Sequence, residues 1–282
     1  ELTVGGDKVT AGAWRADIGR TPLYLLDTNI EANPAHLRGI TDRLYGGDED
    51  HRLRQELVLG IGGVRLLQAL DCHPDVYHIN EGHAAFLTLE RLRRRVAAGV
   101  DIDVAFEIVR ASNAFTTHTP VPAGNKVYEH DLVRPHVTPY LDEMGLSWQD
   151  FLALGQVTPG EGGFGMTTFA LRTSGHANGV SRLHGEVSRA MWSSAWGETP
   201  VDETPIGHIT NGVHTATWVG REVADLYDTH IGPRWRSDPH VSETWDRVAS
   251  IPDAEMWRAH VRASERLVSF AQADLVRGLK AR

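Results

Sequence analysis

Short apolar runs and helical patterns of apolar residues alternate along most of the chain. Each run has the length of a β-strand, and the segments between the runs are long enough for a helix. Four segments are predicted to be strands: 22–28 (PLYLLDT), which we expect to be buried, 76–80 (VYHIN), 114–120 (AFTTHTP) and 207–214 (GHITNGVH), which ends in a turn.

Between the predicted strands, apolar residues recur at spacings of three and four, the period of one helix face. Asp101, Asp131 and Ser147 are predicted to begin helices, and Gly145 and Gly155 to end them, because these residue types satisfy free backbone groups at helix ends. The predicted helices cover residues 53–67, 83–96, 101–113, 131–145, 147–155 and 180–191, and the chain is predicted to be helical from about residue 218 onward.

Strands separated by helices favour β-α-β crossovers and therefore an α/β fold with a parallel sheet. Ligands of such sheets bind beyond the carboxyl ends of the strands. Polar clusters follow three of the predicted strands: NEGH with Asn80 and His83, THTP with His118, and NGVH with Asn211 and His214. We expect these three corners to form one site, with Asn80 also capping the helix that follows it.

Several familiar motifs are absent or out of context. The segment GIGGVR (60–65) lies within a helical stripe and lacks a third glycine, so it is not a dinucleotide fingerprint; we expect Gly60, Gly62 and Gly63 to allow close helix packing. The sequence contains no G-x-S-x-G elbow, no P-loop and no HExxH pattern. Covalent hydrolysis and P-loop chemistry are therefore disfavoured, and no metal site is predicted.

Composition and charge narrow the class of protein further. The 282 residues carry a net charge of −9, with 41% hydrophobic and 23% charged residues, which is ordinary for a globular protein and disfavours binding to nucleic acid or a membrane surface. The single cysteine, Cys72, cannot form an internal disulfide, and no signal peptide or membrane span is evident. We therefore expect a cytoplasmic protein.

Five long motifs occur in an order that resembles one family. They are LYGGDEDHRLRQELVLGIGGVRLL, VYHINEGHAAFLTLERLR, FTTHTPVPAGN, MTTFALRTSGHANGVSRLHGEVSRAMW and PIGHITNGVHTATWV. Together they resemble the α-glucan (glycogen and maltodextrin) phosphorylases in their bacterial form. The resemblance implies the Rossmann-like, parallel-sheet part of a GT-B glycosyltransferase N-terminal domain. Residues 1–215 would be the later part of that domain, and residues 216–282 the helices that open the C-terminal domain.

The resemblance also implies an activity. The family transfers a glucosyl unit from an α-1,4-glucan to inorganic phosphate with retention, giving glucose 1-phosphate. His118 matches the family histidine that contacts the glucosyl unit and whose carbonyl faces the developing positive charge, and Asn211 matches an asparagine that binds the same sugar. Glu81 and His83 match a corner near the glucan path, Asp48 a loop at the catalytic mouth, and His214 is a further substrate contact.

The family's cofactor is pyridoxal phosphate, which is bound to a lysine in the C-terminal domain. Lys8, Lys126 and Lys280 are the only lysines, and none lies in the glycine-rich context of that lysine. We therefore expect a fragment that lacks the cofactor lysine and the early N-terminal segment, and that is inactive by itself. A truncated domain leaves an apolar face uncovered, so we also expect that the chain can form homo-oligomers.

Two alternatives belong to other classes of protein. A non-catalytic glucan-binding module would use tryptophans to stack on sugars, although packing in a core or an interface is the more common role of tryptophan. A metal-dependent hydrolase would use Glu81, His83 and His118. The tryptophans considered for stacking are Trp148, Trp192, Trp196, Trp218 and Trp235.

Overall fold

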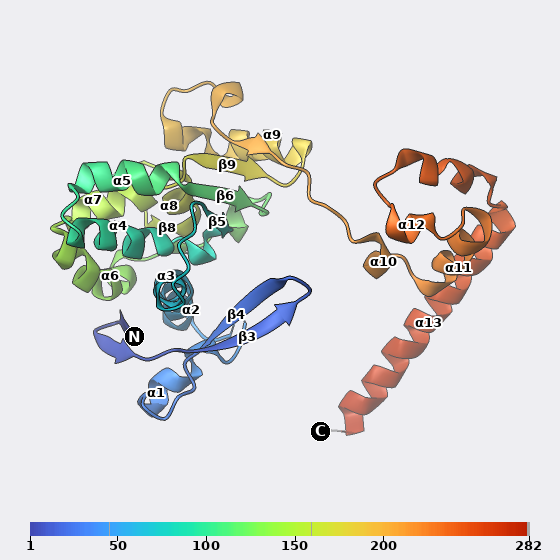
Figure 1. Ribbon diagram of the computed structural model, residues 1–282, viewed down its shortest axis with the longest axis horizontal. Coiled ribbons are helices and arrows are strands. Elements are labelled where there is room, and N and C mark those ends of the chain that lie inside the picture. Colours follow the sequence, from blue (N-terminus) through green and yellow to red (C-terminus); the bar gives the residue numbers. More distant parts are fainter. Residues whose placement is uncertain (45, 159, 281–282) are drawn as a thin grey trace. The chain divides into compact units, whose positions relative to one another are not determined.

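The computed structural model describes residues 1–44, 46–158 and 160–280 (Figure 1). The chain divides into two compact units, Glu1–Asn211 and Gly212–Arg282. The predicted assignment of residues 1–215 and 216–282 to parts of two domains stays a prediction. No helix in the described part of the chain combines the length and the apolar character that crossing a membrane requires.

The first unit is built around a four-stranded parallel sheet with the strand order β10-β9-β6-β5. The prediction of a parallel sheet in an α/β fold is therefore confirmed. The strands of this sheet are β5 (Tyr77–Asn80), β6 (Asn113–Thr117), β9 (His176–Gly179) and β10 (Gly207–His208). Sequence patterns missed β9 because its HANG segment contains no β-branched or aromatic residue.

The remaining strands form two-stranded antiparallel pairs. They are β1 (Leu2–Val4) with β2 (Asp7–Val9), β3 (Gly12–Ile18) with β4 (Thr21–Asp27), and β7 (Val127–Tyr128) with β8 (Phe164–Gly165). The prediction of a buried strand at 22–28 is wrong in burial. In the described part of the chain β4 pairs with β3 in a separate two-stranded hairpin and not in the central sheet, and Leu23 and Leu25 therefore keep 43% and 52% of their surface exposed.

Helices of the first unit surround the sheet and enclose the core (Figure 1). The α-helices are α1 (Ala35–Arg38), α2 (Glu49–Leu57), α3 (Gly63–Ala69), α4 (Leu87–Ala97), α5 (Ile102–Ala111), α6 (His130–Met144), α7 (Trp148–Gly155), α8 (Met166–Arg172) and α9 (Arg182–Trp192). The shorter segments are the π-helix η2 (Val58–Gly62) and the 3₁₀ helices η1 (Gly39–Thr41), η3 (Gly82–Ala84), η4 (Pro122–Gly124), η5 (Ser193–Trp196) and η6 (Val201–Glu203).

Predictions about helix ends were partly right. The side chains of Asp101 and Ser147 cap α5 and α7 by accepting backbone N–H groups, and Gly145 ends α6 in a left-handed conformation. The assignment of Asp131 is wrong, since α6 begins one residue earlier, after Glu129. The proposed cap by Asn80 is also wrong, because the starts of η3 and α4 have no side-chain cap.

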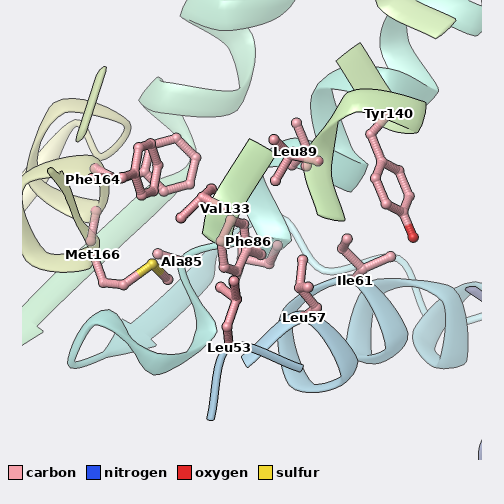
Figure 2. Packing of buried hydrophobic residues seen from close by; sticks show 14 of the residues in the cluster. Leu53, Leu57, Ile61, Ala85, Phe86, Leu89, Val133, Tyr140, Phe164 and Met166 are labelled. Carbon is pink, nitrogen blue, oxygen red and sulfur yellow. The ribbon is translucent and has the colours of Figure 1, made fainter. Parts of the chain in front are cut away.

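Apolar side chains from α2, η2, α4 and α6 meet in one core. Figure 2 shows Leu53, Leu57 and Ile61, which keep the predicted helical spacing, against Phe86 and Leu89. Next to them Phe151 and Phe164 stack with their ring centroids 4.8 Å apart. This core fixes α2, which carries the site residue Glu56, against the start of α4, which follows β5.

Gly60 brings two backbones unusually close together. A Cβ atom at this position would lie 2.7 Å from the backbone nitrogen of Leu87 and 2.8 Å from the carbonyl carbon of Phe86. Real Cβ atoms almost never approach other atoms this closely. The close-packing interpretation is therefore right for Gly60, whereas a Cβ at Gly63 would meet nothing within 4 Å.

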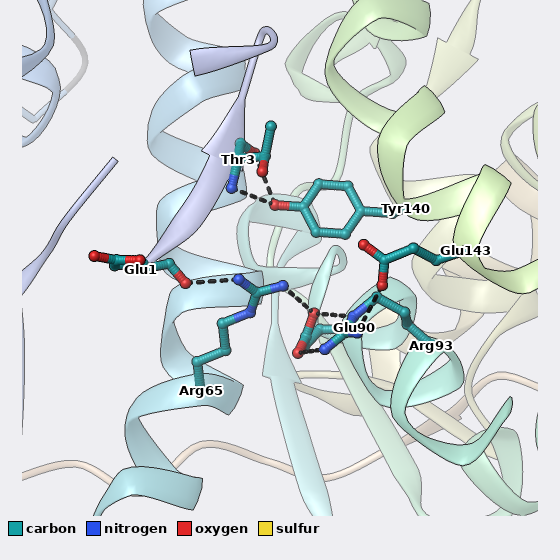
Figure 3. A network of polar contacts seen from close by, with 7 residues as sticks. All are labelled: Glu1, Thr3, Arg65, Glu90, Arg93, Tyr140 and Glu143. Atoms are coloured by element: carbon teal, nitrogen blue, oxygen red, sulfur yellow. Dashed lines mark hydrogen bonds and ion pairs between the residues drawn. The ribbon is translucent and has the colours of Figure 1, made fainter. Parts of the chain in front are cut away.

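A buried carboxylate joins α3, α4 and α6 (Figure 3). Glu90, only 1% of whose side chain is exposed, accepts hydrogen bonds from Arg65 at 2.9 Å and from Arg93 at 2.8 and 2.9 Å. Arg93 also reaches Glu143 at 2.8 Å. Burial by itself would raise the pKa of Glu90, but the hydrogen bonds from Arg93 and Arg65 outweigh it, so this pKa lies below its ordinary value.

The second unit is helical, as predicted from about residue 218 onward. Its core is Trp235, which is fully buried, and the ring of Tyr227 meets this indole edge-on with centroids 5.5 Å apart. The helices are α10 (Thr215–Trp218), α11 (Arg221–His230), α12 (Arg234–Ser237), η7 (Ser242–Thr244), η8 (Asp246–Ser250) and the long α13 (Asp253–Lys280).

Candidate functional site

The carboxyl edge of the parallel sheet brings together polar residues that are far apart in the sequence. Asn80 pairs with Thr116, and Thr117 with Gly179, so Glu81 and His118 follow the ends of adjacent strands. The backbone N–H of Asn211 donates to the carbonyl of Val180 at 3.1 Å, which places Asn211 just beyond the end of β9. Three of the predicted site residues, Glu81, His118 and Asn211, therefore lie at one edge.

Glu81 holds the loop that carries His118. One carboxylate oxygen of Glu81 accepts the backbone N–H of His118, the hydroxyl of Thr119 at 3.0 Å and the hydroxyl of Thr117 at 3.5 Å. The His118 side chain is exposed, whereas Thr117 is fully buried. The structure thus gives Glu81 a positioning contact with the loop of His118.

The backbone of Glu81 is strained. Its φ of +60° lies in the left-handed half of conformational space, where residues other than glycine are uncommon. Such strain costs about 1–3 kcal/mol and persists only where the surrounding structure enforces it. The contacts of its carboxylate with the His118 loop are the enforcing interactions that we observe. Strain of this kind is concentrated at functional sites.

His83 is part of a second polar chain at this corner. Its Nδ1 lies 3.0 Å from a carboxylate oxygen of Glu56 and 3.3 Å from a guanidinium nitrogen of Arg52. The other oxygen of Glu56 accepts the hydroxyl proton of Tyr128 at 3.0 Å. Burial, followed by the negative charge of Glu56, raises the pKa of Tyr128, so its phenol stays protonated and acts as a donor.

Glu56 was missed by sequence reasoning. Its side chain is 4% exposed and lies on the buried face of α2, four residues after Arg52. A glutamate in the sequence HRLRQEL reads as one more charge of an exposed helix surface. One signal was available: Glu56 is three residues after Leu53 and next to Leu57, so it lies on the apolar face of the predicted helix, where it is shielded from solvent.

A cavity of about 490 Å³ opens between these groups. Two cationic side chains, Arg52 and Lys126, and two carboxylates, Glu56 and Glu81, line it together. The ammonium of Lys126 pairs with Glu49. The lining residues are Arg52, Glu56, Glu81, Gly82, His83, Thr119, Gly124, Asn125, Lys126, Val127, Met166 and Thr167. This balanced set of donors and acceptors suits a neutral, hydroxyl-rich ligand better than an ion.

Two other predicted site residues, Asp48 and His214, have local contacts of their own. The carboxylate of Asp48 caps α2 by accepting the backbone N–H of His51 at 2.9 Å, and Asp48 lines a separate cavity of about 390 Å³. His214 belongs to the second unit, where its Nδ1 lies 2.6 Å from the hydroxyl of Thr217. Their substrate contacts therefore stay predictions.

Most of the tryptophans considered for sugar stacking have other partners. Trp192 and Trp235 are buried, and Trp148 packs between His130 and Phe151. Trp218 is 78% exposed. Within the described ranges, no group of three or more His, Cys, Asp or Glu side chains has an arrangement that could hold a metal ion.

An α/β unit with strained, polar residues at the carboxyl edge of its sheet has the architecture of a ligand-binding or catalytic domain. No family model matches the chain. The chain is 42% identical to the maltodextrin phosphorylase of Thermococcus litoralis over 98% of its own length and 32% of the relative's. The corresponding values are 41%, 98% and 33% for the glycogen phosphorylase of Mycobacterium tuberculosis, and 38%, 94% and 38% for that of Aquifex aeolicus.

The chain thus spans about a third of the length of the curated relatives that it matches. The resemblance predicted from its motifs is confirmed over nearly all of its residues. The chain corresponds to a segment of an α-glucan phosphorylase.

Proposed function

We propose that this chain provides the glucan-binding edge of a retaining, GT-B-type α-glucan phosphorylase. The reaction is transfer of a glucosyl unit from an α-1,4-glucan or maltodextrin to inorganic phosphate. The observation that carries the proposal is the set of hydrogen bonds by which the carboxylate of Glu81 fixes the His118 loop. It occurs in a chain that matches maltodextrin and glycogen phosphorylases over nearly its whole length.

In this proposal His118 is the catalytic residue of the chain. Its side chain is exposed at the sheet edge and donates a hydrogen bond to the glucosyl unit, while its backbone carbonyl faces the positive charge that develops at the sugar. Such fixed dipoles stabilise a transition state because they need no reorganisation during the reaction. The carboxylate of Glu81 supplies the rigidity by fixing the backbone N–H of His118.

Asn211 is proposed to hydrogen-bond the same sugar from the end of β9. The balanced charges of the cavity beside Glu81 and His83 support binding of a glucan, because a glucan is neutral and offers many hydroxyl groups. We therefore place the path of the glucan along this corner. Asp48 is proposed to lie in a loop at the catalytic mouth, and His214 is proposed as a further substrate contact.

The lysines whose side chains the structure describes, Lys8 and Lys126, do not fit a pyridoxal phosphate site. Lys8 is exposed on β2, and Lys126 is paired with Glu49 in a cavity that also contains the carboxylates Glu56 and Glu81. Neither lysine has the set of cations that an anionic cofactor requires. The proposed activity therefore depends on a cofactor site outside these residues.

The test is phosphorolysis by the full-length enzyme that contains this segment. His118→Ala should lower the turnover number for phosphate-dependent release of glucose 1-phosphate by about 10²–10³, the usual loss for one stabilising group in a closed site. His73→Ala, at a histidine whose side chain is 70% exposed, is the matched control and should leave turnover unchanged. An unchanged rate in His118→Ala would remove His118 from the site.

The purified 282-residue chain should release no glucose 1-phosphate from maltodextrin. Phosphorolysis by this chain alone would contradict the proposal that the activity depends on a cofactor site outside these residues. Saturable maltodextrin binding by a full-length protein without any phosphorolysis would instead favour a non-catalytic glucan-binding module.

A further inference from the structure

A second cavity, of about 330 Å³, lies at the opposite edge of the parallel sheet. Ser174 and Gly175 come directly before β9, Arg110 is in the last turn of α5 before β6, and Pro205 precedes β10. The amino ends of parallel strands meet at one edge, so this cavity is separate from the edge that carries His118. Its volume is at the lower end of the roughly 300–1,000 Å³ typical of small-molecule sites.

The charge of this cavity differs from that of the protein as a whole. Two guanidinium groups, those of Arg110 and Arg172, line it, and no Asp or Glu is found among the described residues of its lining. The chain carries a net charge of −9, so an acid-free cavity with two arginines is a local exception. Such a set of groups attracts an anion.

Arg172 is a half-buried cation without a carboxylate partner among the described residues. Its guanidinium donates to the carbonyl of Ala153 and, at 2.9 Å, to the carbonyl of Val157. These bonds use two of its five N–H groups, which leaves three for another acceptor. Burial lowers the pKa of Arg172, as expected for a cation whose charge no anion balances. Among the described residues, the guanidinium of Arg110 has one polar side-chain contact, a long one of 3.5 Å with Glu107.

Ser174 provides a third donor. Its residue is 5% exposed, and its hydroxyl has no hydrogen-bond partner in the described part of the chain. A buried hydroxyl without a partner is costly, and most such groups are satisfied by a ligand, an ion or water. Phe106 and Trp196 form apolar and aromatic walls of the same cavity.

We infer that this cavity binds a small organic phosphate, a phosphomonoester with one sugar-sized ring. The phosphate group would accept hydrogen bonds from Arg110, Arg172 and Ser174, and the ring would lie against Trp196. Three donor groups match a phosphate monoester, which has three terminal oxygens, better than a carboxylate, which has two. Arginine is also the side chain best suited to pair with phosphate.

Binding of ribose 5-phosphate to the purified chain tests this inference. Isothermal titration should show saturable binding, with ribose and glucuronate much weaker, which separates the phosphate from the sugar ring and from a carboxylate. Arg110→Gln should weaken binding by about 10- to 100-fold, the usual effect of losing one charged hydrogen bond. Ser174→Ala should weaken it by about threefold to tenfold.

Arg20→Gln is the matched control, since it removes the same charge at the exposed turn between β3 and β4. It should leave the affinity unchanged. Arg172 is left intact in this design because its bonds to Ala153 and Val157 also support α7. Trp196→Phe should abolish any quenching of tryptophan fluorescence by the ligand while retaining heat of binding.

Three results would overturn the inference. One is the absence of saturable binding at ribose 5-phosphate concentrations up to about 10 mM. A dissociation constant above this value would correspond to a very small binding free energy. Another is equal affinity in Arg110→Gln and Arg20→Gln. The third is binding by the purified chain that is lost in the full-length protein, which would mean that other parts of the polypeptide fill this cavity.

Discussion

Glu90→Gln should destabilise the first unit strongly, because it removes the charge that holds two arginines. The carboxylate of Glu90 is 1% exposed and accepts three hydrogen bonds at 2.8–2.9 Å. Glutamine keeps the volume but turns an NH₂ group toward a guanidinium. We therefore attribute the loss to charge and hydrogen bonding, and not to a new cavity.

Breaking a buried ion pair by removing one partner typically costs about 3–5 kcal/mol. The side chains of Arg65 and Arg93 remain 27% and 21% exposed, so water partly compensates for the lost carboxylate. The lower end, about 3 kcal/mol, is therefore expected. For a unit of this size, about 1 kcal/mol shifts the melting temperature by about 2–4 °C, which gives a decrease of about 6–12 °C.

Thermal unfolding of the purified chain followed by circular dichroism measures this decrease. Glu143→Gln is the matched control, because Glu143 binds the same Arg93 at 2.8 Å but keeps 55% of its side chain exposed. An exposed ion pair contributes at most about 1 kcal/mol, so this control should lose no more than about 4 °C. Equal shifts in the two variants would refute the reasoning that burial sets the magnitude.

Three further predictions concern pH, the site loop and the close packing of η2. The pKa of Glu90 is lower in the folded chain than its ordinary value of 4.5, so the carboxylate stabilises the fold fully above pH 4.5 and loses this effect as the pH falls below that value. The difference in melting temperature between wild type and Glu90→Gln should therefore become smaller in acid. A difference that does not change with pH would contradict this. In the full-length enzyme, Glu81→Ala should lower the turnover number about tenfold and Glu81→Gln by less, since the amide oxygen still accepts hydrogen bonds; equal loss would mean that Glu81 acts only by its charge. Gly60→Ala should lower the free energy of unfolding, measured in urea, by about 1–3 kcal/mol or more, because the new methyl group would clash with the backbone of Leu87. Gly63→Ala has open space around it and should leave this free energy unchanged or raise it. Equal effects of the two substitutions would show that the backbone of η2 shifts to make room for the methyl group.

Local patterns predicted the parts of the fold that local patterns control. The strands β5 and β6 and the helices α4 and α5 were recognised because apolar periodicity and caps such as Asp101 are encoded within a few residues. The central strand β9 was missed because its own residues have little strand propensity. It is a strand because β10 and β6 form hydrogen bonds with it on both sides. The prediction that β4 is buried was wrong because burial depends on which other elements cover the hairpin. The local sequence contains no information about those elements.

The site was predictable as a set of corners but not as a set of contacts. Parallel strands bring their carboxyl ends together, so Glu81, His118 and Asn211 could be placed at one edge from their positions after strands. The hydrogen bond from the His118 backbone to Glu81 joins residues 37 positions apart. The link between His83 and Glu56 spans 27 positions. Contacts of this range depend on the folded arrangement of α2, β5 and β6.

The positive φ of Glu81 and the carboxylate of Glu81 make opposite demands on the residue at this position. Glycine would relieve the backbone strain by about 1 kcal/mol, but it would also remove the carboxylate that fixes His118. A hydrogen bond to a charged acceptor contributes about 1.5–3 kcal/mol, so Glu81→Gly should gain no heat resistance. Selection for heat resistance and selection for turnover should therefore both retain a hydrogen-bond acceptor at position 81 of such an enzyme, in spite of its strained backbone.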